Sequence, residues 1–65
     1  MQNKYYRIYA KTKDMTRYQA LDVGQGAVVG NLIYATVYTS LESANNDLKW
    51  LVEDNDSIAF KVVKV

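Results

Sequence analysis

The 65-residue sequence contains no cysteine, no histidine and no proline. Without cysteine the chain can form no disulfide, and it lacks the thiolate nucleophile. Cysteine and histidine are also the most frequent transition-metal ligands, and histidine is the commonest general base near neutral pH. These absences predict a protein that is not an enzyme and that binds no metal ion.

Glycine is scarce as well, since Gly24, Gly26 and Gly30 are its only three positions. They do not match the dinucleotide-binding pattern, because the third glycine comes one residue late, and no Lys-Ser or Lys-Thr follows to complete a P-loop. The acidic residues near position 54 lack the spacing of a calcium loop. We therefore expect no cofactor.

Long hydrophobic runs are missing too. The longest are three or four residues, such as 27–29, whereas a membrane-spanning helix needs about 20. The segment Met1–Arg7 has no apolar stretch of the kind found in signal peptides. The sequence therefore predicts a cytoplasmic protein that does not enter the membrane.

What remains is the composition of an ordinary globular chain, with 49% apolar and 23% charged residues. No repeat or linker divides it, so residues 1–65 are expected to form one small domain. A chain this short buries only about 60% of the surface that its unfolded form exposes. Its stability should be modest, and association with a second copy would add to it.

Two strands joined by a polar connector are predicted in the first third of the chain. Residues 5–11 are rich in β-forming side chains, and their alternation places Ile8 on one face and Tyr9 on the other. Residues 17–23 resume extended character after a loop of about five residues, although which of their side chains point inward stays open. The glycines of 24–26 predict a turn after them.

A third strand is predicted at residues 31–39, where β-branched and aromatic residues are dense. Alternation places Ile33 and Val37 on one face and Tyr34 and Tyr38 on the other. The two tyrosines would then share the face that carries Tyr9 in the first strand.

After this strand the hydrophobic period changes from two residues to 3.6. Residues 39–42 (Thr-Ser-Leu-Glu) match a capping box, which predicts Thr39 as the N-cap of a helix. Asn55 is predicted to end that helix in the left-handed conformation. Residues 57–65 predict a last strand, with Lys61 on its outward face. The apolar stripe of the helix comprises Leu41, Ala44, Leu48, Leu51 and Val52.

Together these elements predict an α+β fold in the order β-β-β-α-β, with a single four-stranded sheet and one helix packed on one face. Following the strand directions along the chain makes the last strand parallel to the first. We favour the strand order 3-2-1-4. A direct crossover that places the last strand beside the third also fits the pattern.

One helix can cover only one face of the sheet, so the other face, which we call the open face, must meet water, another copy of the chain or a ligand. Positive charge is concentrated in residues 1–39, which supply most of the open face. These residues carry five cations and two acids, whereas residues 40–57 carry one cation and five acids. The predicted members of the open face are Tyr5, Arg7, Tyr9, Lys11, Tyr34, Tyr38 and Lys61.

This combination of tyrosines and cations has more than one interpretation. Our main hypothesis is a protein partner or a homodimer, because tyrosine often supplies binding energy in interfaces. The alternative is single-stranded nucleic acid, with rings stacking on bases and cations binding phosphates. The same residues also occur on plain solvent-facing sheet surfaces. Trp50, on the outer side of the predicted helix, is a second candidate, either as an interface anchor or folded over the edge of the sheet or against the loop at Asn55.

Three segments carry a resemblance to known sequences: residues 6–11 (YRIYAK), 20–22 (ALD) and 30–36 (GNLIYAT). They resemble short uncharacterised proteins of Gram-positive bacteria and of their phages or integrative elements. The resemblance implies a bacterial, cytoplasmic accessory protein that binds rather than catalyses. It transfers no functional residue.

Overall fold

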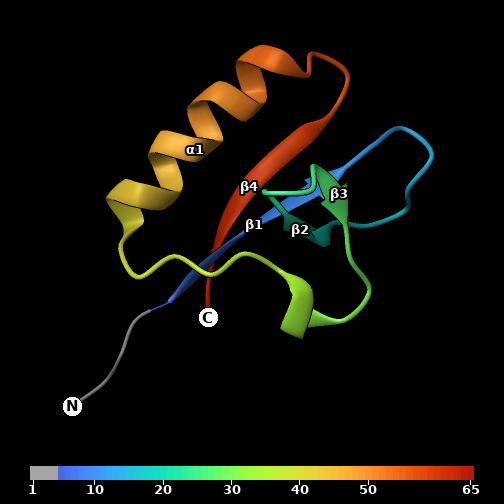
Figure 1. The fold of residues 1–65 in the computed structure, drawn as a ribbon. Coiled ribbons are helices and arrows are strands. Elements are labelled where there is room, and N and C mark those ends of the chain that lie inside the picture. Colours follow the sequence, from blue (N-terminus) through green and yellow to red (C-terminus); the bar gives the residue numbers. More distant parts are fainter. Residues whose placement is uncertain (1–4) are drawn as a thin grey trace.

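The computed structural model describes residues 5–65 (Figure 1). Residues 1–4, part of the segment from which we predicted the localisation, lie outside the described residues. The fold is α+β, with one four-stranded sheet in the order β3-β2-β1-β4 and one helix, so the predicted fold class and strand order are confirmed. The elements are β1 (Tyr6–Lys11), β2 (Gln19–Asp22), β3 (Ala27–Val28), a 3-10 helix (Leu32–Tyr34), α1 (Leu41–Asp54) and β4 (Ala59–Lys64).

The core lies between the helix and the two long strands, β1 and β4 (Figure 1). Ile8 is fully buried at the centre of β1, and Ala44 and Leu51 of α1 are buried against it. Phe60 and Val62 of β4 pack on the same cluster. The alternation predicted for the first and last strands is therefore confirmed, and it leaves the odd-numbered residues of β1 and β4 on the open face.

The strand predicted at residues 31–39 is wrong. Asn31 caps a short 3-10 helix instead, because its side-chain oxygen accepts a hydrogen bond from the Ile33 amide at 3.1 Å. Such a local bond offers the backbone an alternative to a strand ladder. Within this stretch, only Tyr38 forms a β-bridge among the described residues, antiparallel to Tyr6, and the Thr36 amide donates a hydrogen bond to the Leu21 carbonyl of β2 at 3.2 Å. The third strand of the sheet is the two-residue β3, directly after the glycine turn.

The predicted direction of the last strand is also wrong, because β4 runs antiparallel to β1. The stretch that failed to form a strand still crosses the sheet, and its bridge to Tyr6 shows that it runs opposite to β1. The helix therefore starts from the end of the sheet where β1 begins, and β4 has to return in the opposite direction. Because the chain crosses the sheet once more than predicted, the helix and β4 each run in the direction opposite to the predicted one.

Both predicted helix caps need correction. The N-cap is Ser40 rather than Thr39, and its Oγ accepts a hydrogen bond from the Ser43 amide at 3.1 Å. Asn55 ends the helix as predicted but not in the left-handed conformation, since its φ is -137° and its ψ is 78°. Its side-chain amide donates to the Leu51 carbonyl at 3.0 Å, and this bond satisfies one of the last carbonyls of the helix.

Replacing Ser40 with alanine should lower the free energy of unfolding by about 1 kcal/mol, because the first turn of α1 loses the acceptor for the Ser43 amide. Thr39→Ala is the matched control, since it removes the neighbouring hydroxyl that the sequence alone favours as the cap. Urea denaturation followed by circular dichroism measures both. A larger loss for Thr39→Ala would contradict the observed cap.

Among residues 5–65, α1 is the only α-helix. It is neither long enough nor apolar enough to span a bilayer.

Candidate open-face site

The open face carries four of the predicted residues in neighbouring positions. Tyr9 lies opposite Lys61 in the β1–β4 ladder, and Arg7 lies opposite Val63. Lys11 follows two positions after Tyr9 on the same face of β1. Tyr5, which lies just before β1, is 38% exposed. The sheet therefore brings Arg7, Tyr9, Lys11 and Lys61 together on the side away from α1.

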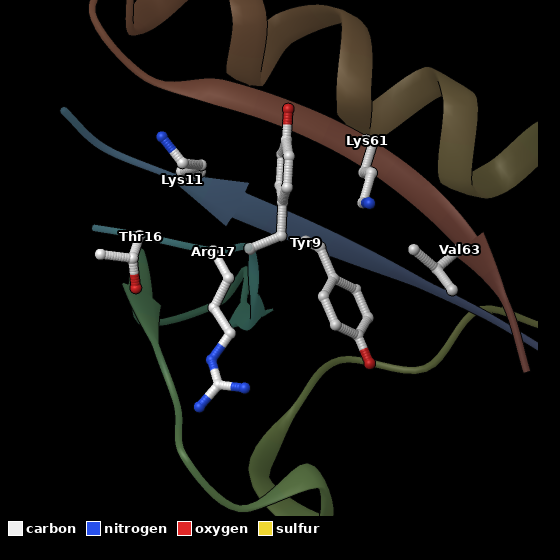
Figure 2. A pocket seen from close by; sticks show the side chains of 7 residues that line it. Tyr9, Lys11, Thr16, Arg17, Lys61 and Val63 are labelled. Carbon is white, nitrogen blue, oxygen red and sulfur yellow. The ribbon is translucent and has the colours of Figure 1, made fainter. Parts of the chain in front are cut away.

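Around Tyr9 the face is hollowed to a volume of ≈ 520 Å³. This Tyr9 hollow is open to solvent along the sheet, and Figure 2 shows side chains reaching into it from β1, from β4 and from the connector before β2. Its lining residues are Tyr9, Lys11, Thr16, Arg17, Tyr18, Lys61 and Val63. Three are cations and two are tyrosines, and the lining, drawn from residues 5–65, contains no acidic side chain.

Sequence reasoning missed four of these residues: Thr16, Arg17, Tyr18 and Val63. The ammonium group of Lys61 lies 4.2 Å from the centre of the Tyr18 ring, close enough for a cation–π interaction. This contact orients Tyr18 across the face, because Lys61 comes from the strand on the far side of β1. Alternation from Ala20 would have placed Tyr18 on the open face if the pairing of Ala20 with Tyr9 had been known.

A second, smaller hollow adjoins the first and shares Tyr9, Arg17 and Tyr18 with it. Its volume is ≈ 280 Å³, and its lining continues through Ala20 to Val29 and Leu32. Ala20 is only 2% exposed. The two hollows together form a groove that crosses the sheet from β4 to the segment after β3, and none of the described residues that line it is acidic.

Tyr38 does not belong to the open face, so its predicted placement there is wrong. It is 9% exposed and lies in the core, where its hydroxyl donates a hydrogen bond of 2.6 Å to Oδ2 of Asp47. Burial raises the pKa of the Tyr38 hydroxyl, and the hydrogen bond to Asp47 and its negative charge raise that pKa further. Tyr38 therefore joins the segment before α1 to the helix.

Tyr34 and Trp50 lie outside the groove as well. Tyr34 is 63% exposed on the 3-10 helix, next to the exposed Leu32 and Ile33. Trp50 is half exposed, and its indole N–H donates to Oδ1 of Asp47 at 3.2 Å. Asp47 thus accepts from both aromatic side chains, and Trp50 lies along its own helix rather than on the sheet.

The lining of the groove combines cations and tyrosine rings with small and apolar residues. Among residues 5–65, no group of three or more acidic side chains could hold a metal ion. Comparisons of the chain with protein-family models, with curated proteins and with solved structures returned no match. The resemblance to short Gram-positive and phage proteins accordingly stays a prediction.

Proposed function

We propose that the protein is a non-catalytic binding domain whose groove binds single-stranded nucleic acid. The observation that supports this is the lining of the Tyr9 hollow, in which three cations and two tyrosines occur without an acidic neighbour. An occupant with matching chemistry is negatively charged and carries flat rings. Single-stranded nucleic acid has both properties in a regular alternation.

The arrangement of the groups fits this occupant. From β4 to β2 the groove crosses two strand spacings, or about 10 Å, which is enough for a short stretch of unpaired nucleotides. Tyr9 offers a ring in the same hollow as Lys11, Arg17 and Lys61. A base can stack on the ring while its neighbouring phosphates meet the cations.

Our main hypothesis from the sequence, a protein partner or homodimer on this face, is less well supported by the charges. Two copies joined through the groove would bring Lys11, Arg17 and Lys61 of each near those of the other, and like charges across an interface are unfavourable. A protein that binds here would need to be acidic. We therefore place an acidic polypeptide among the outcomes of the test.

Binding of a fluorescein-labelled oligothymidine of about ten nucleotides, measured by anisotropy, tests the proposal. With three cations in the groove, the logarithm of the association constant should fall with the logarithm of salt concentration with a slope of about -2. Arg17→Ala should reduce that slope by about 0.7. Tyr9→Ala should weaken binding about five- to a hundredfold through the loss of stacking.

Each variant has a matched control elsewhere on the chain. Lys49→Ala removes the same charge from the exposed side of α1, and Tyr34→Ala removes a tyrosine that lines neither hollow. Both should bind like the wild type. If polyglutamate of the same charge binds with equal affinity, the occupant is an acidic protein instead of nucleic acid. Affinity for the oligonucleotide that does not change with salt concentration, or with the Tyr9→Ala substitution, would refute the proposal.

A further inference from the structure

The two edges of the sheet are unequal. One edge is β3, only two residues long, and the other is β4, a six-residue strand. A long edge strand presents a row of unpaired backbone groups to solvent and can pair with another strand. Among residues 5–65, no backbone or side-chain hydrogen bond reaches the outer side of β4.

The groups that point outward from β4 follow from the inner ladder. The Val65 amide donates to the Tyr5 carbonyl at 2.8 Å. Hydrogen-bonded pairs alternate along an antiparallel ladder, so Val63, Lys61 and Ala59 also face β1 with their peptide groups. The N–H and C=O groups of Phe60, Val62 and Lys64 therefore point away from the sheet. They form a free edge of three residues, each with one donor and one acceptor.

The helix presents an apolar flank on the same side. Asp47 reaches Tyr38, and Tyr38 pairs with Tyr6 on the side of β1 away from β4. At about 100° per residue, Leu41 and Val52 lie on the opposite flank of α1 from Asp47, toward the β4 edge. Leu41 is 48% exposed and Val52 is 50% exposed. Figure 1 shows α1 beside β4 and away from β3.

We infer that the β4 edge is a dimer interface and that its partner is the same edge of a second copy. Antiparallel pairing about a two-fold axis at Val62 joins Val62 to Val62 of the second copy and Phe60 to its Lys64. This register makes two hydrogen bonds for each of three pairs, about six in all. It also brings the Leu41–Val52 flanks of the two helices together on one side of the joined sheet.

Charge favours this register over its neighbours. In the inferred register Lys61 lies opposite Val63 of the second copy, so no lysine faces another. A shift of two residues one way would place Lys61 directly opposite Lys61, which is unfavourable. The same shift the other way would pair Lys64 with Val62, and only residues 62–64 of the two β4 strands would then overlap. The sequence of β4 thus fits one self-complementary arrangement.

The inference does not depend on the proposed nucleic-acid binding, because it uses the outward peptide groups of Phe60, Val62 and Lys64, whereas β4 contributes only the Lys61 and Val63 side chains to the groove. If both hold, the two-fold axis places both grooves on one face of a continuous eight-stranded sheet. Salt-sensitive oligonucleotide binding by a protein that stays monomeric would support the proposed function alone. Dimerisation without such binding would support the dimer interface alone.

Sedimentation equilibrium of the full chain tests the interface. The wild type should be monomeric at about 1 µM and mainly dimeric near 1 mM, as suits a small interface. Val52→Asp should raise the dissociation constant about tenfold or more, because it places a charge on the apolar flank. Ile33→Asp is the matched control, since Ile33 is 76% exposed on the 3-10 helix, and it should leave the constant unchanged.

Cross-linking tests the register in a chain that has no cysteine of its own. In the inferred dimer the two Val62 Cα atoms lie about 5.5 Å apart, within the range for a disulfide. Val62→Cys should therefore form a disulfide dimer under mild oxidation faster than Val37→Cys, although Val62 is half buried and Val37 is 46% exposed. Faster oxidation of Val37→Cys, or a wild type that stays monomeric near 1 mM, would overturn the inference.

Discussion

Replacing Ile8 with alanine is expected to lower the free energy of unfolding by about 3 kcal/mol. Ile8 is fully buried, and removing its methyl groups costs both hydrophobic transfer energy and a cavity. A domain of this length has a total stability of roughly 3–10 kcal/mol, so this single change removes a large part of it. Urea denaturation, followed by circular dichroism, gives the difference in unfolding free energy.

Ile33→Ala is the matched control for this change. It deletes the same atoms from a side chain that is 76% exposed on the 3-10 helix, so its cost should be within about 0.5 kcal/mol. The comparison also discriminates between two folds of the same sequence. If residues 31–39 formed the strand predicted from their alternation, Ile33 would face inward and its replacement would cost nearly as much as that of Ile8.

The second large effect is expected at Tyr38. Tyr38→Phe removes the hydroxyl that donates to Asp47, a hydrogen bond to a charged acceptor, and should cost about 1.5–3 kcal/mol at neutral pH. Tyr34→Phe should be neutral, because Tyr34 is 63% exposed on the 3-10 helix. Urea denaturation near pH 7 measures both.

The contribution of the Tyr38 hydroxyl should also depend on pH. Its pKa is raised in the folded protein, first by burial and then by Asp47, so the folded state keeps the proton more tightly than the unfolded chain does. The stabilisation is therefore fully present below the unfolded tyrosine pKa of about 10 and is lost as the pH rises toward the folded value. The difference between wild type and Tyr38→Phe should shrink between about pH 9 and about pH 11. A constant difference over that range would contradict the assignment.

Much of the fold could be predicted because β1, β4 and α1 follow simple periods. Alternation in β1 placed Ile8 inside and Tyr9 outside, and both positions are confirmed. The helical stripe was right at its centre, where Ala44 and Leu51 are buried. These elements pack directly on one another, so the buried positions of each recur with the period of its own secondary structure.

Residues 31–39 could not be assigned in this way. Their β-branched and aromatic side chains suit a strand, but hydrogen bonds to the side chains of Asn31 and Thr36 organise the segment instead. Asn31 holds the Ile33 amide, and the Thr36 hydroxyl accepts from the Val23 amide at 2.9 Å. Neither hydrogen bond produces a periodic pattern of hydrophobic residues in the sequence. The same loss of period placed Tyr38 on the wrong face and reversed the expected direction of β4.

The site was predicted in part for a related reason. Arg7, Tyr9, Lys11 and Lys61 belong to the two long strands, and the structure brings them to one face as the alternation indicated. Arg17 and Tyr18 lie in the connector and reach the groove only through the register between Tyr9 and Ala20. A pairing register between strands is not encoded in the period of either strand alone.

The pairing of β1 with β4 has a consequence for how the chain acquires its fold. The ladder joins Tyr6 to Lys64, nearly the whole described length apart in sequence, and it forms the centre of the core. Forming contacts between distant residues costs loop-closure entropy before those contacts stabilise the chain. A protein with many such contacts therefore folds slowly for its size. During synthesis Ile8 emerges first, and although β2 can pair with one side of β1, the other side has no partner strand until Val62 follows. The central strand of the sheet can therefore be completed only after β4 has left the ribosome.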